Sequence, residues 1–232
     1  MIAVAGGKGG SGKTTTTLGL ARALSRRGAR TIAADADWDL PNLARLAAET
    51  ATDGGPADPD LPGGPEDETT VRDAVPGTVL VRPDRSEPTV LAAPDAPRSV
   101  DAFGALAALD GATPDGAPVL LDCPAGASAD AAAPLRAADR ALIATPLRRA
   151  ALRDAAKTAA IARRLDCPPV GAVAVGEASV PDSVATLLGC PVLGAVPDGG
   201  AEPLSDPAVR SAYDELARRL GETAAADGWQ IA

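Results

Sequence analysis

The stretch Ile2–Thr17, IAVAGGKGGSGKTTTT, decides the fold and contains the most specific motif in the chain. A short apolar run is followed by a glycine-rich segment and then by Lys13 and Thr14. The spacing Gly7-x-x-x-x-Gly12-Lys13-Thr14 is the phosphate-binding P-loop pattern. In such a loop backbone N–H groups surround an anion, the lysine reaches the terminal phosphates and the threonine hydroxyl binds Mg²⁺. The stretch therefore predicts a strand, a phosphate-binding loop and a helix whose N-terminus faces the phosphates.

The alternative interpretation is a flexible glycine turn between a strand and a helix. Two observations favour the phosphate site. A helix is expected from Thr14 to Arg27, directly after the loop, and Gly28 is suited to close it. The chain has only three lysines, Lys8, Lys13 and Lys157, and two of them lie in this loop, whereas arginine is used almost everywhere else.

The segment Lys8–Thr14, KGGSGKT, resembles the deviant Walker A motif of the MinD/ParA family of ATPases. The resemblance implies ATP and Mg²⁺ as cofactors and a homodimer in the ATP-bound state. It implies that Lys13 neutralises phosphate charge, and that Lys8 reaches across the dimer to the nucleotide of the partner subunit. The nucleotide-binding residues that it implies in this loop are Gly7, Gly9, Gly10, Ser11, Gly12, Lys13, Thr14 and Thr15.

Length and composition limit the class of protein. A chain of 232 residues suits one α/β domain with a sizeable core, and a content of 46% hydrophobic but 2% aromatic residues requires a core of Ala, Val, Leu and Ile. The net charge of −9 argues against DNA as a partner, because nonspecific DNA binding depends on neutralising phosphates with Lys and Arg. The acidic balance and the scarcity of lysine resemble proteins from salt-in halophiles. One group of arginines is expected to form a solvated helix face: Arg148, Arg149, Arg153, Arg163 and Arg164.

The three cysteines, Cys123, Cys167 and Cys190, lie far apart and form no C-x-x-C pair. Their number and spacing argue against a disulfide framework and against a zinc or iron–sulfur site, and favour a reducing cytoplasm. No charged leader precedes the first strand, and no apolar run approaches the roughly 20 residues that cross a bilayer. We therefore expect a cytoplasmic protein, with peripheral association with a membrane left open.

Thr31–Ala34 is the second expected strand, and it runs into the acidic segment Asp35-Ala36-Asp37. Acidic residues at the carboxyl end of a strand in an α/β sheet face the ligand crevice, and carboxylate oxygens suit Mg²⁺. An Asp-rich turn or helix cap is the structural alternative, since Asp is common in turns. The segment resembles switch I of the MinD/ParA family, which implies that Asp37 positions the attacking water and that Asp35 helps to hold the Mg²⁺ shell.

Pro118–Leu121 is an expected strand that runs into Asp122-Cys123-Pro124-Ala125-Gly126. An apolar strand that ends in aspartate is the Walker B pattern, and the carboxylate of Asp122 would hold a Mg²⁺-bound water opposite Thr14. The Pro-Ala-Gly that follows resembles switch II of the same family. Cys123 is expected to be a small packed side chain and not a nucleophile, because the chain contains no histidine that would activate it.

The rest of the chain alternates between helix and strand patterns. The expected helices are 44–50, Ser99–Leu109 with Ser99 as its cap and Val100, Phe103, Leu106 and Leu109 on one face, Ala129–Ala138 with a kink or break at Pro134, Arg149–Leu165, Val180–Leu188 and Pro207–Leu220. The expected strands are Thr89–Ala93, Arg140–Ala144, Val170–Val175 and Val192–Val196, and Thr52–Glu68 reads as a surface loop. This order predicts a doubly wound, mostly parallel sheet with helices on both faces, as one domain over residues 1–220 with a short tail over residues 221–232.

The resemblance extends to Ile143–Thr158, IATPLRRAALRDAAKT, but it fails at the expected base site. The family usually has an Asn-Arg pair after the strand that corresponds to Val170–Val175, and the Asn recognises adenine. This chain has Gly176-Glu177 there, which leaves the base specificity open. Pro197 and Asp198 match a family segment whose backbone lies near the adenine ring, so these two residues are the implied base contacts.

These resemblances imply a MinD-like ATPase, an ATP-dependent dimerising switch for intracellular positioning or partitioning, with an unidentified protein partner or cargo. Two alternatives stay open: a scaffold or regulator that binds ATP with little hydrolysis, and a ParA-like DNA partition ATPase, which the charge disfavours. An iron–sulfur carrier of the Mrp type shares the P-loop, but the missing C-x-x-C argues against it. The segment after Gly221 is short and acidic, and is unlike the basic amphipathic helix that ends membrane-cycling MinD proteins.

Overall fold

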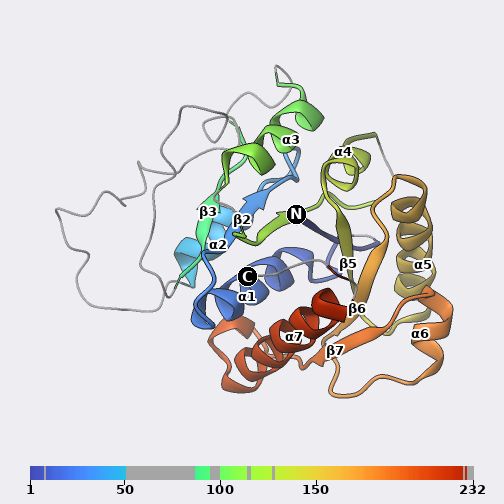
Figure 1. Ribbon diagram of the computed structural model, residues 1–232. Helices are drawn as coiled ribbons and strands as arrows, with labels where there is room; N and C mark the ends of the chain where they lie inside the picture. The colour runs from blue at the N-terminus through green and yellow to red at the C-terminus, as the bar shows by residue number, and fades with distance from the viewer. Residues whose placement is uncertain are drawn as a thin grey trace, which may run out of the picture.

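The computed structural model describes residues 1–7, 9–50, 87–94, 100–113, 116–126, 129–226 and 228, without the side chains of residues 129 and 130. Strands and helices alternate along this part of the chain (Figure 1). The strands are β1 (Ile2–Ala5), β2 (Ile32–Asp35), β3 (Thr89–Leu91), β4 (Val119–Asp122), β5 (Arg140–Thr145), β6 (Pro169–Val175) and β7 (Val192–Val196). The helices are α1 (Lys13–Arg26), α2 (Leu43–Glu49), α3 (Ala102–Ala112), α4 (Ala129–Ala137), α5 (Arg149–Arg164), α6 (Ser183–Leu188), the 3₁₀ turn η2 (Pro203–Ser205) and α7 (Pro207–Ala226).

The strands form one seven-stranded sheet in the order β3-β2-β4-β1-β5-β6-β7. Every neighbouring pair is parallel. Parallel strands are buried on both faces, which explains why β1, β2 and β4 are short apolar runs without polar alternation. The doubly wound α/β fold predicted from the sequence is confirmed, and its described part is parallel throughout.

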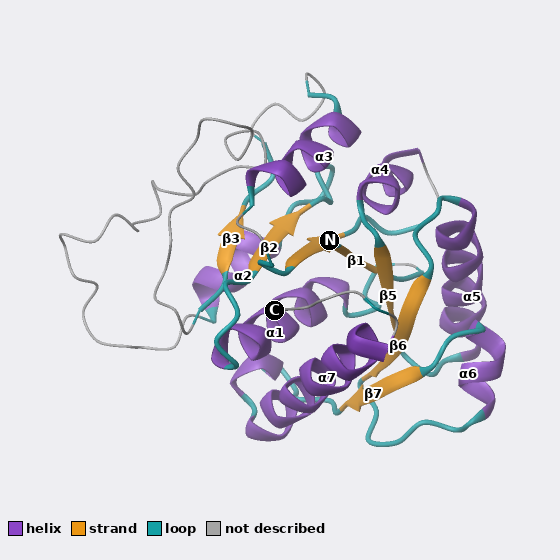
Figure 2. Cartoon of the chain, viewed as in Figure 1, coloured by secondary structure: helices purple, strands orange, loops and turns teal. Residues whose placement is uncertain are grey.

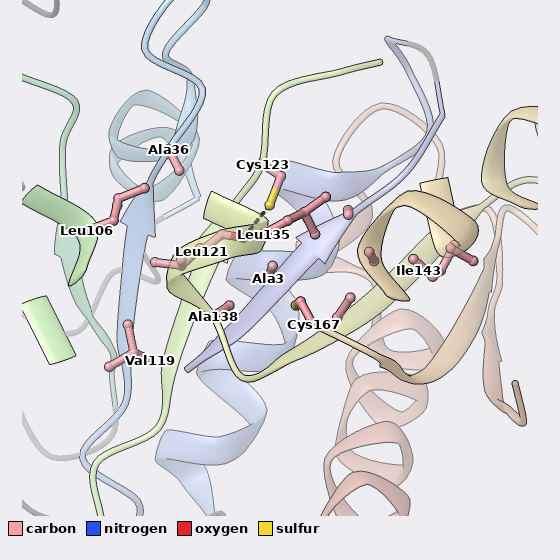
Figure 3. Close-up of a cluster of buried hydrophobic side chains, with 14 of the residues drawn as sticks. Ala3, Ala36, Leu106, Val119, Leu121, Cys123, Leu135, Ala138, Ile143 and Cys167 are labelled. Carbon is pink, nitrogen blue, oxygen red and sulfur yellow. Dashed lines mark hydrogen bonds between the residues drawn. The ribbon is translucent and has the colours of Figure 1, made fainter. Parts of the chain in front are cut away.

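Helices cover both faces of the sheet and enclose two hydrophobic cores (Figure 2). One core lies under α3, α4, α5 and α6, and the other under α1, α2 and α7. Successive side chains of a strand point to opposite faces, so Ala3 belongs to the first core and Val4 to the second. Figure 3 shows the first core, in which small side chains such as Ala3, Ala138 and Cys167 predominate.

All three cysteines are free and buried. Cys123 packs in the first core beside Leu135, with its thiol donating to the backbone oxygen of Leu121 (3.6 Å; Figure 3). Burial raises the pKa of the Cys123 thiol well above its ordinary value and raises the pKa of Cys167 to about 12. The prediction that Cys123 is a packed side chain is confirmed, and its burial disfavours the thiolate, which is the reactive form.

The helix α7 packs against α1, and Gly19 is a point of very close approach. A Cβ atom on Gly19 would lie 2.3 Å from Cε2 of Tyr213 in α7. Tyr213 is buried, and its hydroxyl donates to Oγ1 of Thr16 (3.4 Å), one turn before Gly19. The ring of Tyr213 therefore occupies the space that any larger residue at position 19 would need.

Replacing Gly19 with alanine is expected to lower the free energy of unfolding by about 2 kcal/mol, because overpacking outweighs the gain of up to about 1 kcal/mol in helix propensity. Urea denaturation followed by circular dichroism measures the change. Gly221 is the matched control, since it is also helical but has open space around its Cβ position. The replacement of Gly221 with alanine should stabilise the protein, and a Gly19 variant that is equally stabilised would contradict the packing argument.

The helix α3 differs from its sequence-based prediction. It begins at Ala102 with Asp101 at its N-cap, and the predicted cap Ser99 lies outside the described residues. The prediction that Phe103 belongs to the buried face is wrong, since its exposed fraction is 46% whereas Leu106 and Leu109 are buried. Ala105 takes the place of Phe103 in the buried stripe, and at 100° per residue Phe103 lies almost opposite Ala105 on the helix.

Other boundaries also shift. α6 begins at Ser183 and not at Val180, because a residue that precedes a proline disfavours helical dihedrals. α4 continues through Pro134. The missing N–H of this proline removes only one backbone hydrogen bond, the one to a carbonyl in the first turn of the helix. α7 extends six residues past Leu220, and Ala224 is buried on it. The predicted loop Thr52–Glu68 lies outside the described residues, and within those residues no helix is long and apolar enough to cross a membrane.

Candidate functional site

The carboxyl ends of β1, β2 and β4 meet at one edge of the sheet. Asp122 of β4 lies opposite Val4 of β1 on one side and opposite Asp35 of β2 on the other. The three loops that leave these strands are therefore neighbours: the P-loop, the segment after Asp35 and the segment after Asp122. The structure thus brings together acidic side chains that are 87 positions apart in the sequence, at the start of α1.

Gly7 and Gly12 are among the positions where the P-loop has no room for a side chain. Gly12 has a φ of +81°, and a Cβ atom there would lie 2.6 Å from Cγ1 of Val175 in β6. A Cβ atom on Gly7 would lie 2.6 Å from Cβ of Asp154 in α5. The oxygen of Gly7 accepts a hydrogen bond from the N–H of Gly126 (2.8 Å), which joins the P-loop to the segment after β4. Side chains at either position would displace the loop, whereas Gly9 and Gly10 face open space.

The N-terminus of α1 is open toward the loop. Gly12 is its N-cap and has no side chain to cap it, and the first intrahelical bond runs from the N–H of Thr16 to the oxygen of Gly12 (2.8 Å). The N–H groups of Lys13, Thr14 and Thr15 precede that first bond and have no intrahelical acceptor. Oriented N–H groups and the positive end of the helix dipole favour an anion at this position.

Two polar side chains of the loop lack a partner among the described residues, and the hydroxyl of Ser11 is also fully buried. Lys13 is 7% exposed, and among the described residues its ammonium has no hydrogen-bond or ion-pair partner. Ser11 is 4% exposed, and its hydroxyl has no partner within the described part of the chain. Burying a polar or charged group without a partner is costly. The donors present therefore fit a phosphate, which would satisfy both groups.

Asp122 is the buried carboxylate nearest to this cluster. Burial raises its pKa to about 7, and the hydroxyl of Thr14 and the charge of Lys13 act in the opposite direction. Thr17, one turn further along α1, donates to Oδ1 of Asp122 (3.4 Å). A carboxylate held beside the Thr14 hydroxyl supplies the kind of oxygen that Mg²⁺ prefers.

Asp35 is also buried, but its oxygens are already engaged. Its Oδ2 accepts the N–H groups of Asn42 (2.9 Å) and Leu43 (3.0 Å), and its Oδ1 accepts that of Asp37 (3.0 Å). Burial raises the pKa of Asp35, and these three hydrogen bonds oppose the rise. Asp35 thus holds the loop after β2 against the start of α2, as the structural alternative of a turn or cap predicted, and it still lies beside Asp122.

Asp37 differs from the other two carboxylates because it is only half-buried. Its Oδ1 accepts the N–H of Leu40 (3.2 Å), which shapes a short turn. The indole N–H of Trp38 donates to the oxygen of Asp35 (3.0 Å) and anchors the residue that follows Asp37. Solvent therefore reaches Asp37 while its backbone is held in place, which suits a residue that orients a water molecule.

A metal ion here would need ligands other than carboxylates. The described residues contain no group of three His, Cys, Asp or Glu side chains that would hold a metal by themselves. Bound Mg²⁺ commonly uses one or two carboxylates together with phosphate oxygens and water. The set around Thr14 and Asp122 fits that pattern and depends on the nucleotide to complete it.

The predicted base contacts lie on the loops after β6 and β7. The N–H groups of Gly176 (2.8 Å) and Glu177 (3.0 Å) both donate to the oxygen of Val196, the residue before Pro197. Asp198 is exposed, and its Oδ1 accepts the N–H of Gly200 (3.0 Å). These bonds join the two loops, and the roles of Pro197 and Asp198 toward a base stay predictions.

Sequence reasoning missed three residues that touch the site, and the predicted Lys8 lies outside the described residues. Thr17 bonds Asp122, and its position one turn after Thr14 in the run Thr14–Thr17 was an available signal. Thr158 donates to the oxygen of Gly6 (3.4 Å), and Asp154 packs on Gly7, both from α5. The α5 contacts join residues about 150 positions apart. The resemblance over Ile143–Thr158 includes both residues, but it does not reveal that they contact the P-loop.

Comparison with known proteins places this site in a family. The model of the CobQ/CobB/MinD/ParA nucleotide binding domain matches residues 2–225. The septum site-determining protein MinD of Synechocystis is 35% identical over 158 residues, which are 67% of this chain and 56% of that protein. The chain thus spans only about half the length of this curated relative.

Solved structures share the fold. The septum site-determining protein MinD of Pyrococcus horikoshii, in complex with Mg-ADP, has a TM-score of 0.76 and 20% identity, with 98% of each chain covered. McdA of Cyanothece has a TM-score of 0.65 and 18% identity, with 95% of this chain and 98% of McdA covered. At these identities the likeness shows the fold alone.

Proposed function

The chain belongs to the CobQ/CobB/MinD/ParA nucleotide-binding domain family, and from this premise we propose that it is an ATPase that binds Mg·ATP in the P-loop and dimerises in response. The strongest support comes from the buried, unpartnered Lys13 and Ser11 at the open N-terminus of α1. A terminal phosphate of ATP would form an ion pair with the ammonium of Lys13 and accept a hydrogen bond from the hydroxyl of Ser11. The Mg-ADP complex of the P. horikoshii protein supports the same class of ligand.

Each residue has a proposed role. The backbone of Gly7, Gly9, Gly10, Ser11 and Gly12, with the first turn of α1, binds the phosphates, and Lys13 neutralises their charge. Thr14 and Asp122 would hold Mg²⁺, and the contribution of Asp35 would be indirect because its oxygens bind three backbone N–H groups. Mg²⁺, when bound, stabilises the charge that develops on the phosphate oxygens. Asp37 orients the attacking water, so catalysis rests on positioning and electrostatics.

The dimer is part of the proposed site. Lys8 would reach the phosphates bound by the partner subunit, as the KGGSGKT motif implies. The base would lie between the loops after β6 and β7, with Pro197 and Asp198 as neighbours. Because backbone groups on these loops remain, we propose that ATP is preferred although Gly176-Glu177 replaces the usual pair.

The cellular role is proposed as a MinD-like switch for positioning or partitioning in the cytoplasm, with a protein partner or cargo and peripheral membrane association as one mode of action. The similarity to the septum site-determining protein MinD of Synechocystis supports this group of functions. The second candidate is a scaffold that binds ATP with little hydrolysis, which the altered Gly176-Glu177 segment favours. The domain over residues 1–220 is proposed to carry the site in either case.

Measuring phosphate release and oligomeric state with Mg·ATP in high salt tests this proposal. The wild type should dimerise and hydrolyse ATP. The Asp37→Ala variant should stay dimeric with hydrolysis reduced roughly a hundredfold, because binding is kept and water orientation is lost. The Lys8→Ala variant should remain monomeric and inactive, whereas Lys157→Ala, the matched control at the third lysine, should behave as wild type. Negligible hydrolysis in all four proteins with ATP still bound would favour the scaffold.

A further inference from the structure

A second cationic site lies on α1, away from the P-loop. It is a cavity of about 210 Å³ between α1, η2 and α7. Three arginines line it, Arg22 and Arg26 from α1 and Arg210 from α7, together with Glu87, Leu204 and the ring of Tyr213. The close contact between Gly19 and Tyr213 brings the two helices together here, so that arginines from both helices line one cavity.

Arg22 and Arg26 have N–H donors that no described residue accepts. Arg22 is only 8% exposed, and it uses Nε for Glu87 (3.0 Å) and Nη1 for Thr50 (2.9 Å). Arg26 uses Nε and Nη2 for one oxygen of Asp214 (3.2 and 2.6 Å). A guanidinium carries five N–H donors, so both keep N–H groups without an acceptor among the described residues.

Arg210 has no partner at all within the described part of the chain, apart from the helical bond of its backbone. The lining of the cavity contains three arginines and one carboxylate, that of Glu87, so positive charge is in excess there; Asp214, which pairs with Arg26, is not part of the lining. This excess stands out in a chain whose net charge is −9. Guanidinium groups bind planar or tetrahedral oxyanions through paired, charge-assisted hydrogen bonds.

We propose that this cavity binds a small oxyanion of the phosphate class, such as a phosphate monoester. The free N–H groups of Arg22, Arg26 and Arg210 would donate to its oxygens, and Tyr213 and Leu204 would contact its apolar part. The site is distinct from the nucleotide phosphates, because Arg22 lies nine residues after Lys13, about 14 Å along the helix at 1.5 Å per residue. It therefore does not depend on the proposed ATPase activity.

Isothermal titration with inorganic phosphate, at constant ionic strength set with NaCl, tests the site. Wild type should show saturable binding, and Arg210→Ala should weaken it by roughly tenfold, the size expected for one lost charge-assisted hydrogen bond. Arg210 is exposed, so this variant should fold normally. Arg164→Ala is the matched control, since Arg164 is an exposed arginine on α5, and it should bind as wild type.

The P-loop is the competing phosphate site, and Lys13→Ala separates the two. If the cavity binds phosphate, this variant keeps the Arg210-dependent binding. Binding that disappears in Lys13→Ala and persists in Arg210→Ala would assign the phosphate to the P-loop and overturn the proposal. Absence of saturable binding in wild type would overturn it as well.

Discussion

Replacing Lys13 with alanine is expected to lower the rate of ATP hydrolysis by roughly 10²–10³-fold, the loss seen when one electrostatic stabiliser of a transition state is removed. Lys13 lies at the open end of α1, and among the described residues its ammonium makes no hydrogen bond or ion pair within 4 Å, although its charge acts on the pKa of Asp122. The phosphate charge that it would offset increases toward the leaving group during phosphoryl transfer. Steady-state phosphate release with saturating Mg·ATP measures the effect.

The same replacement should not destabilise the protein in the absence of nucleotide. Lys13 makes no ion pair or hydrogen bond within the described residues, so its removal breaks no direct contact and takes a charge out of a largely buried side chain. Thermal unfolding without nucleotide should therefore occur at the wild-type temperature or above it. An inactive variant that unfolds well below the wild type would show that Lys13 has a structural partner, and Lys157→Ala controls for the loss of one lysine.

The parts of the site that could be predicted are those that depend on residues close together in the sequence. Gly7, Gly12 and Lys13 belong to one motif, and Gly7 and Gly12 occupy positions that have no room for a side chain. Asp35 and Asp122 follow apolar runs, and the parallel sheet brings the carboxyl ends of such runs to one edge. Local pattern and topology together therefore predict that these residues lie at one edge of the sheet, around the candidate site.

The parts that could not be predicted depend on where distant segments meet. Asp35 accepts hydrogen bonds from the N–H groups of Asn42 and Leu43 only because of the path that the loop takes. The same sequence is equally compatible with an open acidic turn in which these bonds are absent. The contact of Gly19 with Tyr213 joins positions 194 residues apart. Helix periodicity also could not decide whether Ala105 or Phe103 is buried, because either residue can share an apolar stripe with Leu106 and Leu109.

The Asp122→Asn replacement is expected to separate stability from function. Burial raises the pKa of Asp122 from 3.8 to about 7, so between these pH values the unfolded chain loses this proton while the folded chain keeps it. The unfolded state then binds fewer protons, and the free energy of unfolding falls by about 1.4 kcal/mol for each pH unit in that window. The stabilisation is complete below pH 4 and is lost as the pH rises through about 7.

Asparagine has nearly the same shape and no charge, so the variant should lack this slope and should be more stable than wild type at pH 8, by about 2 kcal/mol after allowance for relaxation around the buried group. It should also lose stabilisation by Mg·ATP and most of its hydrolysis, roughly a hundredfold, since the proposed metal ligand is gone. Denaturation across pH 4–8, with and without Mg·ATP, measures both effects. Asp110→Asn, at an exposed carboxylate on α3, should change neither. If Asp122→Asn is less stable than wild type at pH 8, the surroundings of Asp122 stabilise its ionised form in the folded protein, and the raised pKa on which this prediction rests would be wrong.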